Sequence, residues 1–466
     1  VAIIGAGTAG MYALREVQRA GKSFLLIDHG PLGTTCARVG CMPSKLALHT
    51  ANLWAARKDL AGIGISGAEA LRLDTQKAWK TLREKRDGFA GSATRDSVRR
   101  AGEFLVKGYA RFLEPTTLSV ENEGKSCIIR AKAVIIATGS RPNVPAFLEG
   151  LSSRLVTTDT LFELPDLPSS MGILGLGAIG LEMGLALSRL GVRVIGADIA
   201  STVGGITDPE IRDAALKLFG SEMELWLGTP ASAKLSGNSL LMQAGEKENE
   251  VEMLLVAMGR RPNMDALNLE AAGFKMDERG IPLFDPASLQ VGNYPVFIAG
   301  DANASRPLMH ESADEGAIAG YNAARGTALP FKRKVLLGIA FTRPDLCNVG
   351  ASLDELDPDA ILIGEARGRA NSRARVLGTE SDILRIYAAK ADGKLLGASI
   401  LASSGEHLAH EIAWAIQRGE TAASLLELPF YHPVVEEMLK SALQKIAKAA
   451  ANAGNHPLPF GLRLKG

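Results

Sequence analysis

Short apolar runs alternate with glycine-rich turns and amphipathic stretches in the first part of the chain. The segment VAIIGAGTAGMYALREVQRAGKSFLLID (residues 1–28) predicts a buried strand, a tight turn, a helix and a second strand. The segment MGILGLGAIGLEMGLALSRLGVRVIGAD (171–198) repeats that order of elements. Two strand–helix–strand units built on one plan are typical of an α/β fold.

A second repeated pattern follows each of these units. AVIIATGSRPN (133–143) and MLLVAMGRRPN (253–263) both predict a buried strand that runs into a glycine turn and a Pro-Asn stop. The glycine of the second copy is Gly259. NYPVFIAGDAN (293–303) predicts a further buried strand that ends at Asp301.

Longer periodic stretches predict helices between and after these strands. We expect helices over 45–60, 76–100, 404–418 and 433–451, and one that begins within 306–316. Pro433 would set the start of the last helix. From residue 333 onward the pattern becomes richer in strands, so the chain ends in a third unit.

Composition narrows the class of protein. A chain of 466 residues is long enough for two to four domains. The 52 Lys and Arg residues balance 51 Asp and Glu residues, which argues against binding to nucleic acid or to an anionic membrane. No apolar run is as long as a membrane span and no signal-peptide pattern is present, so we expect a cytoplasmic protein. Because Val1 begins directly in a strand, we expect a few residues to precede it.

The glycine turns of the two repeats carry the spacing of a dinucleotide-binding fingerprint. The residues are Gly5, Gly7, Gly10 and Asp28 in the first repeat, and Gly175, Gly177, Gly180 and Asp198 in the second. Each aspartate lies 23 positions after the first glycine of its turn. The glycines allow a pyrophosphate to approach the backbone, and the carboxylate accepts hydrogen bonds from a ribose. The sequence therefore predicts two bound dinucleotides.

Two of the four cysteines lie close together in GTTCARVGCMPSK (33–45). In an ideal helix Cys36 and Cys41 would lie roughly 8–9 Å apart at Cα. A disulfide needs about 4.4–6.8 Å, so a bond would require a distorted turn, which Gly40 and Pro43 permit. The residues alone leave two interpretations equally open: a reducible disulfide, or two small buried thiols near a helix start.

The remaining candidate groups carry less weight. Cys127 and Cys347 are far apart in strand-like settings, which argues against a secreted disulfide framework. His407 and His410 have a spacing found in metal sites, but no third ligand is evident, and we expect no metal.

Taken together, the motifs resemble those of a known enzyme family. They are GAGTAG (5–10), TCARVGCMPSK (35–45), ATGS (137–140), GLGAIGLE (175–182), AMGRRPN (257–263), AGD (299–301), FTRPDLCNVG (341–350) and HPVVEE (432–437). From end to end the chain resembles the class I FAD-dependent pyridine nucleotide-disulfide oxidoreductases, most of all the dihydrolipoamide dehydrogenase group.

This resemblance implies an α/β fold with two Rossmann-like dinucleotide-binding domains and a C-terminal α+β dimerisation domain. Residues 1–145 and 266–330 would form the FAD-binding domain, 146–265 the NAD-binding domain, and 331–466 the dimerisation domain.

The resemblance also implies the catalytic groups. Cys36 and Cys41 would form a redox disulfide, with Cys36 exchanging with substrate and Cys41 lying nearer the flavin. Thiol–disulfide exchange needs a thiolate, so a base is required. His432 would be that base and Glu437 would orient it. In the family this pair acts on the disulfide of the other subunit, so a homodimer is expected.

Further residues are carried over as cofactor contacts. Lys45 and Glu182 would form an ion pair near the reactive nitrogen of the flavin. Other residues expected at FAD are Asp28, Ala110, Ser140, Asp301 and Met309, and those expected at NAD include Asp198 and Gly259. A carboxylate at Asp198 would repel the 2′-phosphate of NADP, and 199–205 offers no Arg or Lys to hold it, so we expect NAD(H).

The chain also departs from the dihydrolipoamide dehydrogenase pattern. Phe430 and Val434 stand where that group has His and Thr, which would make the disulfide channel more apolar. MPSK (42–45) fits the lipoamide type better than glutathione reductase, and 456–466 lacks the cysteine pair of mercuric reductase.

We therefore expect oxidoreduction between NAD(H) and a dithiol or disulfide, with dihydrolipoamide or a lipoyl-carrying protein as the substrate. Two alternatives remain open. One is an NADH-dependent flavoprotein reductase of a quinone or a different disulfide. The other is a slow-turnover redox-sensing subunit.

Overall fold

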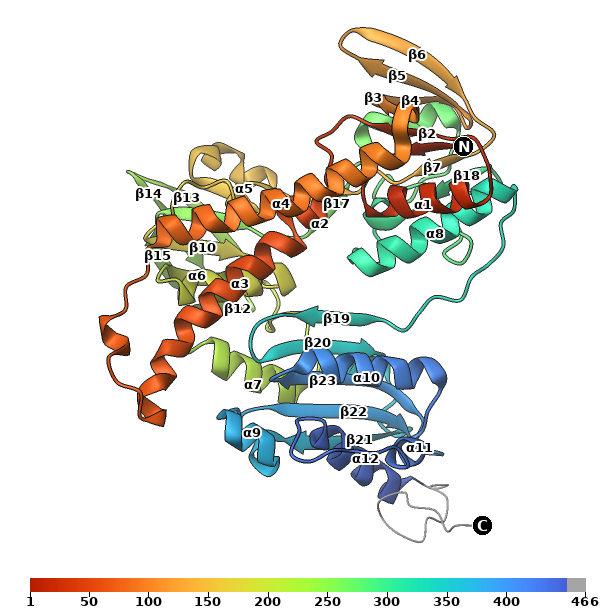
Figure 1. Ribbon diagram of the computed structural model, residues 1–466. Helices are drawn as coiled ribbons and strands as arrows, with labels where there is room; N and C mark the ends of the chain where they lie inside the picture. The colour runs from red at the N-terminus through yellow and green to blue at the C-terminus, as the bar shows by residue number, and fades with distance from the viewer. Residues whose placement is uncertain (451–466) are drawn as a thin grey trace, which may run out of the picture.

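The computed structural model describes residues 1–450 and is built around three five-stranded sheets (Figure 1). The first sheet is wholly parallel, and three of its five short strands are apolar and buried throughout. Its order is β18 (Val296–Ile298), β7 (Val134–Ile136), β1 (Ala2–Ile4), β2 (Leu25–Asp28) and β3 (Leu105–Lys107). Three runs of sequence that are far apart thus meet in one sheet, as expected of strands covered on both faces.

Two helices cover one face of this sheet and pack against each other unusually closely. They are α1 (Thr8–Arg19) and α8 (Met309–Arg325), which lie side by side in Figure 1. A Cβ added at Gly316 would lie 2.1 Å from the carbonyl oxygen of Ala9, and one at Gly320 would lie 2.5 Å from that of Ala13. Each helix follows a strand of the sheet, so both helix N-termini lie at the same edge.

The second sheet repeats the plan of the first. Its five strands are all parallel: β12 (Glu224–Leu227), β11 (Arg193–Asp198), β10 (Ser170–Leu174), β16 (Met253–Val256) and β9 (Leu155–Thr157). Helix α6 (Ala178–Arg189) follows β10 as α1 follows β1. Each half also carries a three-stranded antiparallel sheet, β4–β6 (Tyr109–Glu114, Thr117–Asn122, Lys125–Arg130) and β13–β15 (Ala231–Ser236, Ser239–Ala244, Lys247–Val251). The predicted α/β class is confirmed.

The two Gly-x-x-Pro-Asn repeats pair with each other. Strand β8 (Ser140–Pro142) and strand β17 (Arg260–Pro262) form a two-stranded antiparallel ribbon. The N–H of Asn143 donates to the carbonyl of Gly259, and the N–H of Asn263 donates to the carbonyl of Gly139, each at 3.0 Å. The ribbon therefore ties the first half of the chain to the second.

The two long helices after the first turn agree closely with the sequence prediction. The helix expected over 45–60 is α3 (Cys41–Ala56), which begins four residues earlier and continues as a 3₁₀ helix over Arg57–Ile63. The helix expected over 76–100 is α4 (Thr75–Ala101), capped by the carboxylate of Asp74. Helix α3 packs against both α4 and α6, which brings the residues of its first turns next to the second half of the chain.

The C-terminal unit is an antiparallel sheet with helices. Its strand order is β19 (Leu337–Ala340), β20 (Asp345–Gly350), β23 (Leu395–Ala402), β22 (Ile383–Ala389) and β21 (Ile361–Arg367). Helix α10 (Gly405–Arg418), predicted over 404–418, is followed by α11 (Ala422–Leu426) and α12 (Glu437–Ala449). The expectation that α12 starts at Pro433 is wrong. The N–H of Val434 donates to the carboxylate of Glu437 in a separate turn, and the helix begins only after it.

A buried polar cluster joins the C-terminal unit to the second half. Asp208 is fully buried and accepts hydrogen bonds from Arg385 Nε at 2.8 Å and from the Tyr387 hydroxyl at 2.7 Å. Its other oxygen caps α7 (Pro209–Phe219) through the N–H of Glu210 at 3.0 Å. Within residues 1–450, no helix is both long and apolar enough to cross a membrane. The proposed domain boundaries stay a prediction, and residues 456–466 lie outside the described part.

Candidate active site

The first glycine turn leaves open space where a pyrophosphate would lie. Gly5 has a positive φ of 109°, and a Cβ there would lie 2.2 Å from the carbonyl oxygen of Ala137. A Cβ at Gly10 would lie 1.8 Å from the carbonyl oxygen of Gly5, so helix α1 can approach strand β1 only because that residue is glycine. At Gly7, by contrast, nothing lies within 4 Å. Its backbone faces free space at a helix N-terminus, which favours an anion.

The second glycine turn has the same geometry. A Cβ at Gly175 would lie 2.4 Å from the carbonyl oxygen of Ala257, and one at Gly180 would lie 1.8 Å from that of Gly175. Nothing lies within 4 Å of Gly177. The open space at Gly7 and Gly177 therefore fits a dinucleotide at both turns. This is a structural observation, independent of the sequence spacing.

The two aspartates that follow the turns are held in matching ways. Asp28 accepts hydrogen bonds from the N–H groups of Ala6 and Gly30, each at 2.6 Å. Each carboxylate oxygen has more than one acceptor position, so both retain capacity for the hydroxyl groups of a ribose.

Asp198 has the equivalent partners in the second half. The N–H groups of Leu176 and Ala200 donate to its two oxygens at 2.6 and 2.8 Å. The backbone of the glycine turn thus fixes each aspartate directly beside the open space at the turn.

A break between two helices brings the cysteine pair together. Cys36 lies in the short helix α2 (Thr35–Val39), and Cys41 is the first residue of α3. Gly40 separates the helices, with φ −119° and ψ −110°, and a Cβ there would lie 3.4 Å from the Cα of Cys36. The expected distortion is therefore located at Gly40. Pro43 instead lies within the first turn of α3, where its missing N–H has no intrahelical role.

Both sulfurs are half-buried free thiols, and they differ in acidity. The hydrogen bond from the Cys36 thiol lowers the pKa of Cys41 to about 7, and the charge of Lys45 also lowers it. The same hydrogen bond raises the pKa of Cys36, as does its burial. Cys41 is thus the sulfur that is present as a thiolate near neutral pH.

An ion pair between half-buried Lys45 and buried Glu182 lies next to the cysteines. Lys45 Nζ is 2.7 and 2.8 Å from the two carboxylate oxygens of Glu182, which is only 4 % exposed. The N–H of Phe341 donates to Glu182 at 3.0 Å, and the ammonium of Lys45 lies 4.6 Å from the centre of the Phe341 ring. Three parts of the chain, α3, α6 and the segment after β19, therefore hold one charge pair.

Asp301 is held by a serine from the first repeat. The Ser140 hydroxyl donates to Oδ2 of Asp301 at 2.7 Å, and Arg260 donates to the same hydroxyl at 2.8 Å. The sequence analysis did not single out Arg260. A signal was present, because Arg260 and Ser140 occupy the same position in the two repeats.

One cavity collects most of the residues expected at the active site. Those that line it are Gly7, Cys36, Cys41, Lys45, Glu182, Asp301 and Met309, with Arg260 and Ile339 in addition. Thr138 lies at the first glycine turn, and its buried hydroxyl has no hydrogen-bond partner within residues 1–450. An unpartnered hydroxyl beside an open turn is what a missing polar ligand would leave. These residues fit FAD.

Ala110 is a weaker candidate. Its side chain is buried on β4 against the core that includes Phe112 and Val120, and it does not line the cavity. Any contact with a cofactor would have to come from its backbone. Its assignment stays a prediction.

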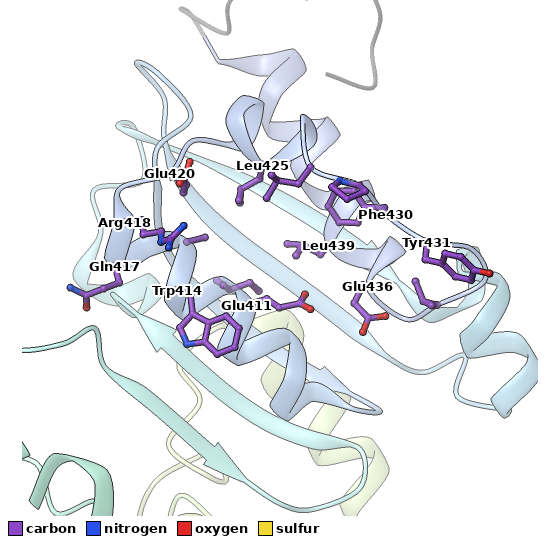
Figure 2. A pocket seen from close by; sticks show the side chains of 15 residues that line it. Glu411, Trp414, Gln417, Arg418, Glu420, Leu425, Phe430, Tyr431, Glu436 and Leu439 are labelled. Carbon is purple, nitrogen blue, oxygen red and sulfur yellow. The ribbon is translucent and has the colours of Figure 1, made fainter. Parts of the chain in front are cut away.

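His432 and Glu437 form a pair in the C-terminal unit and do not line the cysteine cavity. His432 Nδ1 lies 3.0 Å from Glu437 Oε2, and the imidazole is 66 % exposed. Beside the pair is a groove of about 810 Å³, lined by α10, α11 and the segment before α12 (Figure 2). Phe430 and Val434 line this groove rather than the cysteine cavity of their own chain.

Side chains in Figure 2 make the groove mainly apolar, with a few charges. Trp414 projects from α10, and Tyr431 extends from the segment before α12; both are exposed. Glu411 and Glu436 add carboxylates near its centre. Among the described residues, no group of three or more His, Cys, Asp or Glu side chains is placed to hold a metal ion.

Comparison with known protein families gives two matches that together span most of the chain. Residues 1–328 match the family described as "Pyridine nucleotide-disulphide oxidoreductase". Residues 337–443 match its "dimerisation domain".

Relatives of similar length are also found. A dihydrolipoyl dehydrogenase of Trypanosoma brucei brucei is 28% identical over 457 residues, covering 95% of both chains. One from Staphylococcus aureus is 28% identical over 458 residues, with the same coverage.

Solved structures show the same fold. LpdA from Mycobacterium tuberculosis superimposes with a TM-score of 0.84 at 21% identity, covering 96% of this chain and 99% of its own. The HOCl-induced flavoprotein disulfide reductase RclA from Escherichia coli gives 0.81 at 22% identity, with coverages of 95% and 98%.

Proposed function

Because this chain belongs to the pyridine nucleotide-disulphide oxidoreductase family, we propose that it passes electron pairs between NAD(H) and a dithiol or disulfide substrate through FAD and the Cys36–Cys41 pair. The observation that carries this proposal is the cavity in which both thiols, one of them acidified, lie beside the Lys45–Glu182 pair and the open turn at Gly7.

The residues divide into two cofactor sites. FAD would be held by the turn from Gly5 to Gly10, with Asp28 at the ribose and Asp301 and Met309 at the inner part of the cavity. The turn from Gly175 to Gly180, with Asp198 and Gly259, would hold NAD(H). Bound FAD would supply the two-electron carrier between the nicotinamide and the cysteine pair.

The cysteines would act on the substrate by thiol–disulfide exchange. With the pair oxidised, a thiolate of the substrate attacks the sulfur of Cys36, the Cys36–Cys41 bond breaks, and Cys41 leaves as a thiolate. The second substrate thiolate then attacks the substrate sulfur bonded to Cys36, which forms the substrate disulfide and releases Cys36. The low pKa of Cys41 supports its role as leaving group.

The proton from the substrate thiol needs an acceptor. His432 is a suitable base, because Glu437 accepts from Nδ1 and leaves Nε2 free to take a proton. The pair does not line the cysteine cavity of its own chain, and residues 337–443 match the family's dimerisation domain. A homodimer in which His432 serves the partner's cysteines is therefore the arrangement we propose.

NAD(H) is preferred over NADP(H) in this proposal. The carboxylate of Asp198 lies where a ribose is expected and would repel a 2′-phosphate. The adjoining Ile199–Gly205 has no positive side chain.

Dihydrolipoamide, free or carried on a lipoyl protein, is the substrate that the curated relatives support. A quinone or a different disulfide is the second candidate, and the apolar side chains of Phe430 and Val434 beside the histidine turn would suit either of these or lipoamide. A cytoplasmic location stays a prediction.

The test compares the wild-type protein with the Cys36→Ser variant. We expect the purified protein to be yellow, to reduce lipoamide with NADH, and to show a long-wavelength thiolate-to-flavin band on anaerobic titration with NADH. Cys36→Ser should lose lipoamide reduction but retain NADH-dependent reduction of ferricyanide, which bypasses the cysteines. Lipoamide turnover that survives in the variant would refute the route through the pair. Background lipoamide rates in a wild-type protein that binds FAD would favour another acceptor or a redox-sensing role.

A further inference from the structure

Arg260 and Ser140 are equivalent residues of the two repeats, yet their chemistry differs and their side chains meet. Arg260 Nε donates to the Ser140 hydroxyl and Nη2 donates to the Ser140 carbonyl, each at 2.8 Å. The Arg260 side chain is only 17 % exposed and lines the cysteine cavity. With the Lys45–Glu182 pair, this contact joins the two halves at the cavity wall.

The direction of these hydrogen bonds determines where the hydroxyl proton of Ser140 points. A guanidinium has donors and no acceptor, so the hydroxyl oxygen of Ser140 must accept from Arg260. The single O–H of Ser140 is then left to donate to Oδ2 of Asp301, at 2.7 Å. Oδ2 already accepts this short bond, whereas Oδ1 has only a long contact of 3.4 Å from the Ser312 hydroxyl. By holding the Ser140 hydroxyl against Oδ2, Arg260 helps to orient Asp301 and leaves Oδ1 the more open oxygen for a ligand hydroxyl.

The other end of the guanidinium is tied to the second half of the chain. Nη1 lies 3.3 Å from the Thr158 hydroxyl and 3.5 Å from a carboxylate oxygen of Asp159, at the start of α5 (Thr158–Leu161). Arg260 also follows Gly259 directly, on β17, the strand of the ribbon that comes from the second repeat. Four hydrogen-bonding contacts therefore hold one side chain between the two halves.

We infer that Arg260 is a positioning residue for the flavin site: through Ser140 it orients Asp301 and so sets how tightly the protein holds FAD. The inference rests on the proposed function, because it needs FAD beside Asp301. It adds a role for a residue of the second repeat in binding the cofactor of the first.

The chain offers a matched control on the same strand. Arg261 follows Arg260 on β17, is 57 % exposed, and pairs with Asp265 at 3.1 Å without contacting Ser140. Arg261→Gln removes an equal charge from the ribbon and leaves the Arg260–Ser140–Asp301 contacts in place. Arg260→Lys keeps the charge but replaces the planar fork, whose Nε and Nη2 each donate to one oxygen of Ser140, by a single ammonium nitrogen.

The experiment measures the dissociation constant for FAD in the full-length protein, by quenching of flavin fluorescence, for five proteins besides the wild type. They are Arg260→Gln, Arg260→Lys, Arg261→Gln, Ser140→Ala and the double variant of Arg260→Gln with Ser140→Ala. We expect both Arg260 variants and Ser140→Ala to weaken FAD binding by about tenfold or more, since hydrogen bonds of charged groups have that effect. Arg261→Gln should bind FAD as the wild type does.

Non-additivity separates positioning from a general structural role. If Arg260 acts through Ser140, the double variant should bind FAD little worse than Ser140→Ala alone. Fully additive losses, or unchanged FAD binding in both Arg260 variants, would overturn the inference. If Arg260→Gln does not fold, Arg260→Lys and Ser140→Ala still decide the matter. A wild-type protein that binds no FAD would refute the proposed function itself, which distinguishes the two failures.

Discussion

Cys41 is the residue whose chemistry depends most directly on its neighbours. The thiol of Cys36 and the ammonium of Lys45 both favour its thiolate. Replacing Cys36 by Ala should therefore raise the pKa of Cys41 from about 7 toward the ordinary value of about 8.5. Lys45→Met should also raise it, because the nearby positive charge is lost.

The measurement is the rate of alkylation by iodoacetamide against pH in the reduced protein, because only the thiolate reacts. The exposed Cys127 is replaced by Ser in every protein compared, so that it does not contribute to the signal. Below about pH 8 the variants should react more slowly than the parent at Cys41. A midpoint that stays near 7 without Cys36 would show that the hydrogen bond does not acidify Cys41.

Asp198 should decide which nicotinamide nucleotide is used. Asp198→Ser combined with Ile199→Arg removes the repulsion of a 2′-phosphate and supplies a cation for it. We expect KM to rise for NADH and to fall for NADPH, with the preference moving by at least about tenfold. Ile199→Arg alone is the control, since the carboxylate is retained, and an unchanged preference for NADH in the double variant would contradict the assignment.

The residues that could be predicted are those that follow a local sequence pattern. The glycines and aspartates follow from a fixed spacing. The structure gives Gly5, Gly10, Gly175 and Gly180 a steric reason, whereas Gly7 and Gly177 border open space. Arg260 could not be predicted from spacing, because its importance arises from contacts with segments far along the chain. Thr138 stands out only by a buried hydroxyl that has no hydrogen-bond partner within residues 1–450. The roles of His432 and Ala110 depend on a partner subunit and a cofactor respectively, so they remain predictions.

At the scale of elements, the contact between α1 and α8 leaves no room for a larger side chain at Gly316. Gly316→Ala would place a methyl group 2.1 Å from the carbonyl oxygen of Ala9, where backbone cannot yield. The helices would have to separate, which should lower the free energy of unfolding by about 2 kcal/mol or more. FAD binding should weaken as well, since Gly7 and Met309 at the two helix starts both line the cavity.

Chemical denaturation of the apoprotein and a titration with FAD would measure both effects. Gly88→Ala is the matched control, because Gly88 lies exposed in α4 with nothing within 4 Å of the added methyl. That substitution should be neutral or should stabilise by up to about 1 kcal/mol. Equal behaviour of the two variants would contradict the close-packing argument.

Helices with a strong periodicity of apolar residues could be predicted from the sequence. Strand pairings between distant segments could not. Helices α3 and α4 agree with the apolar pattern to within a few residues. The ribbon of β8 and β17 joins segments about 120 residues apart, and nothing in either repeat indicates its partner. The prediction that α12 begins at Pro433 failed, because the side chain of Glu437 stabilises a turn that precedes the helix.

At the scale of the whole molecule, the position of His432 leads to a test by mixed dimers. A chain with Cys36→Ser lacks the exchanging sulfur, and a chain with His432→Gln lacks the base. In a dimer of one chain of each kind, sites shared between subunits would include one with an intact Cys36 and an intact His432. Sites formed within one chain would all be defective.

We therefore expect the mixed dimer, purified with two different affinity tags, to have about half the lipoamide activity of the wild type. Each homodimer of a single variant should have almost none. Activity of the mixed dimer no higher than that of the homodimers would exclude a site shared across the interface.

The ribbon of β8 and β17 bears on how the parts of the molecule can move relative to one another. It ties the unit of residues 155–256 to the first half of the chain, while Asp208 ties the same unit to the C-terminal sheet through Arg385 and Tyr387. A unit held at both ends is less free to swing as a rigid body. If residues 155–256 bind the nicotinamide nucleotide as proposed, we expect its admission to depend on movement of side chains at the cavity, and not on the opening of a hinge.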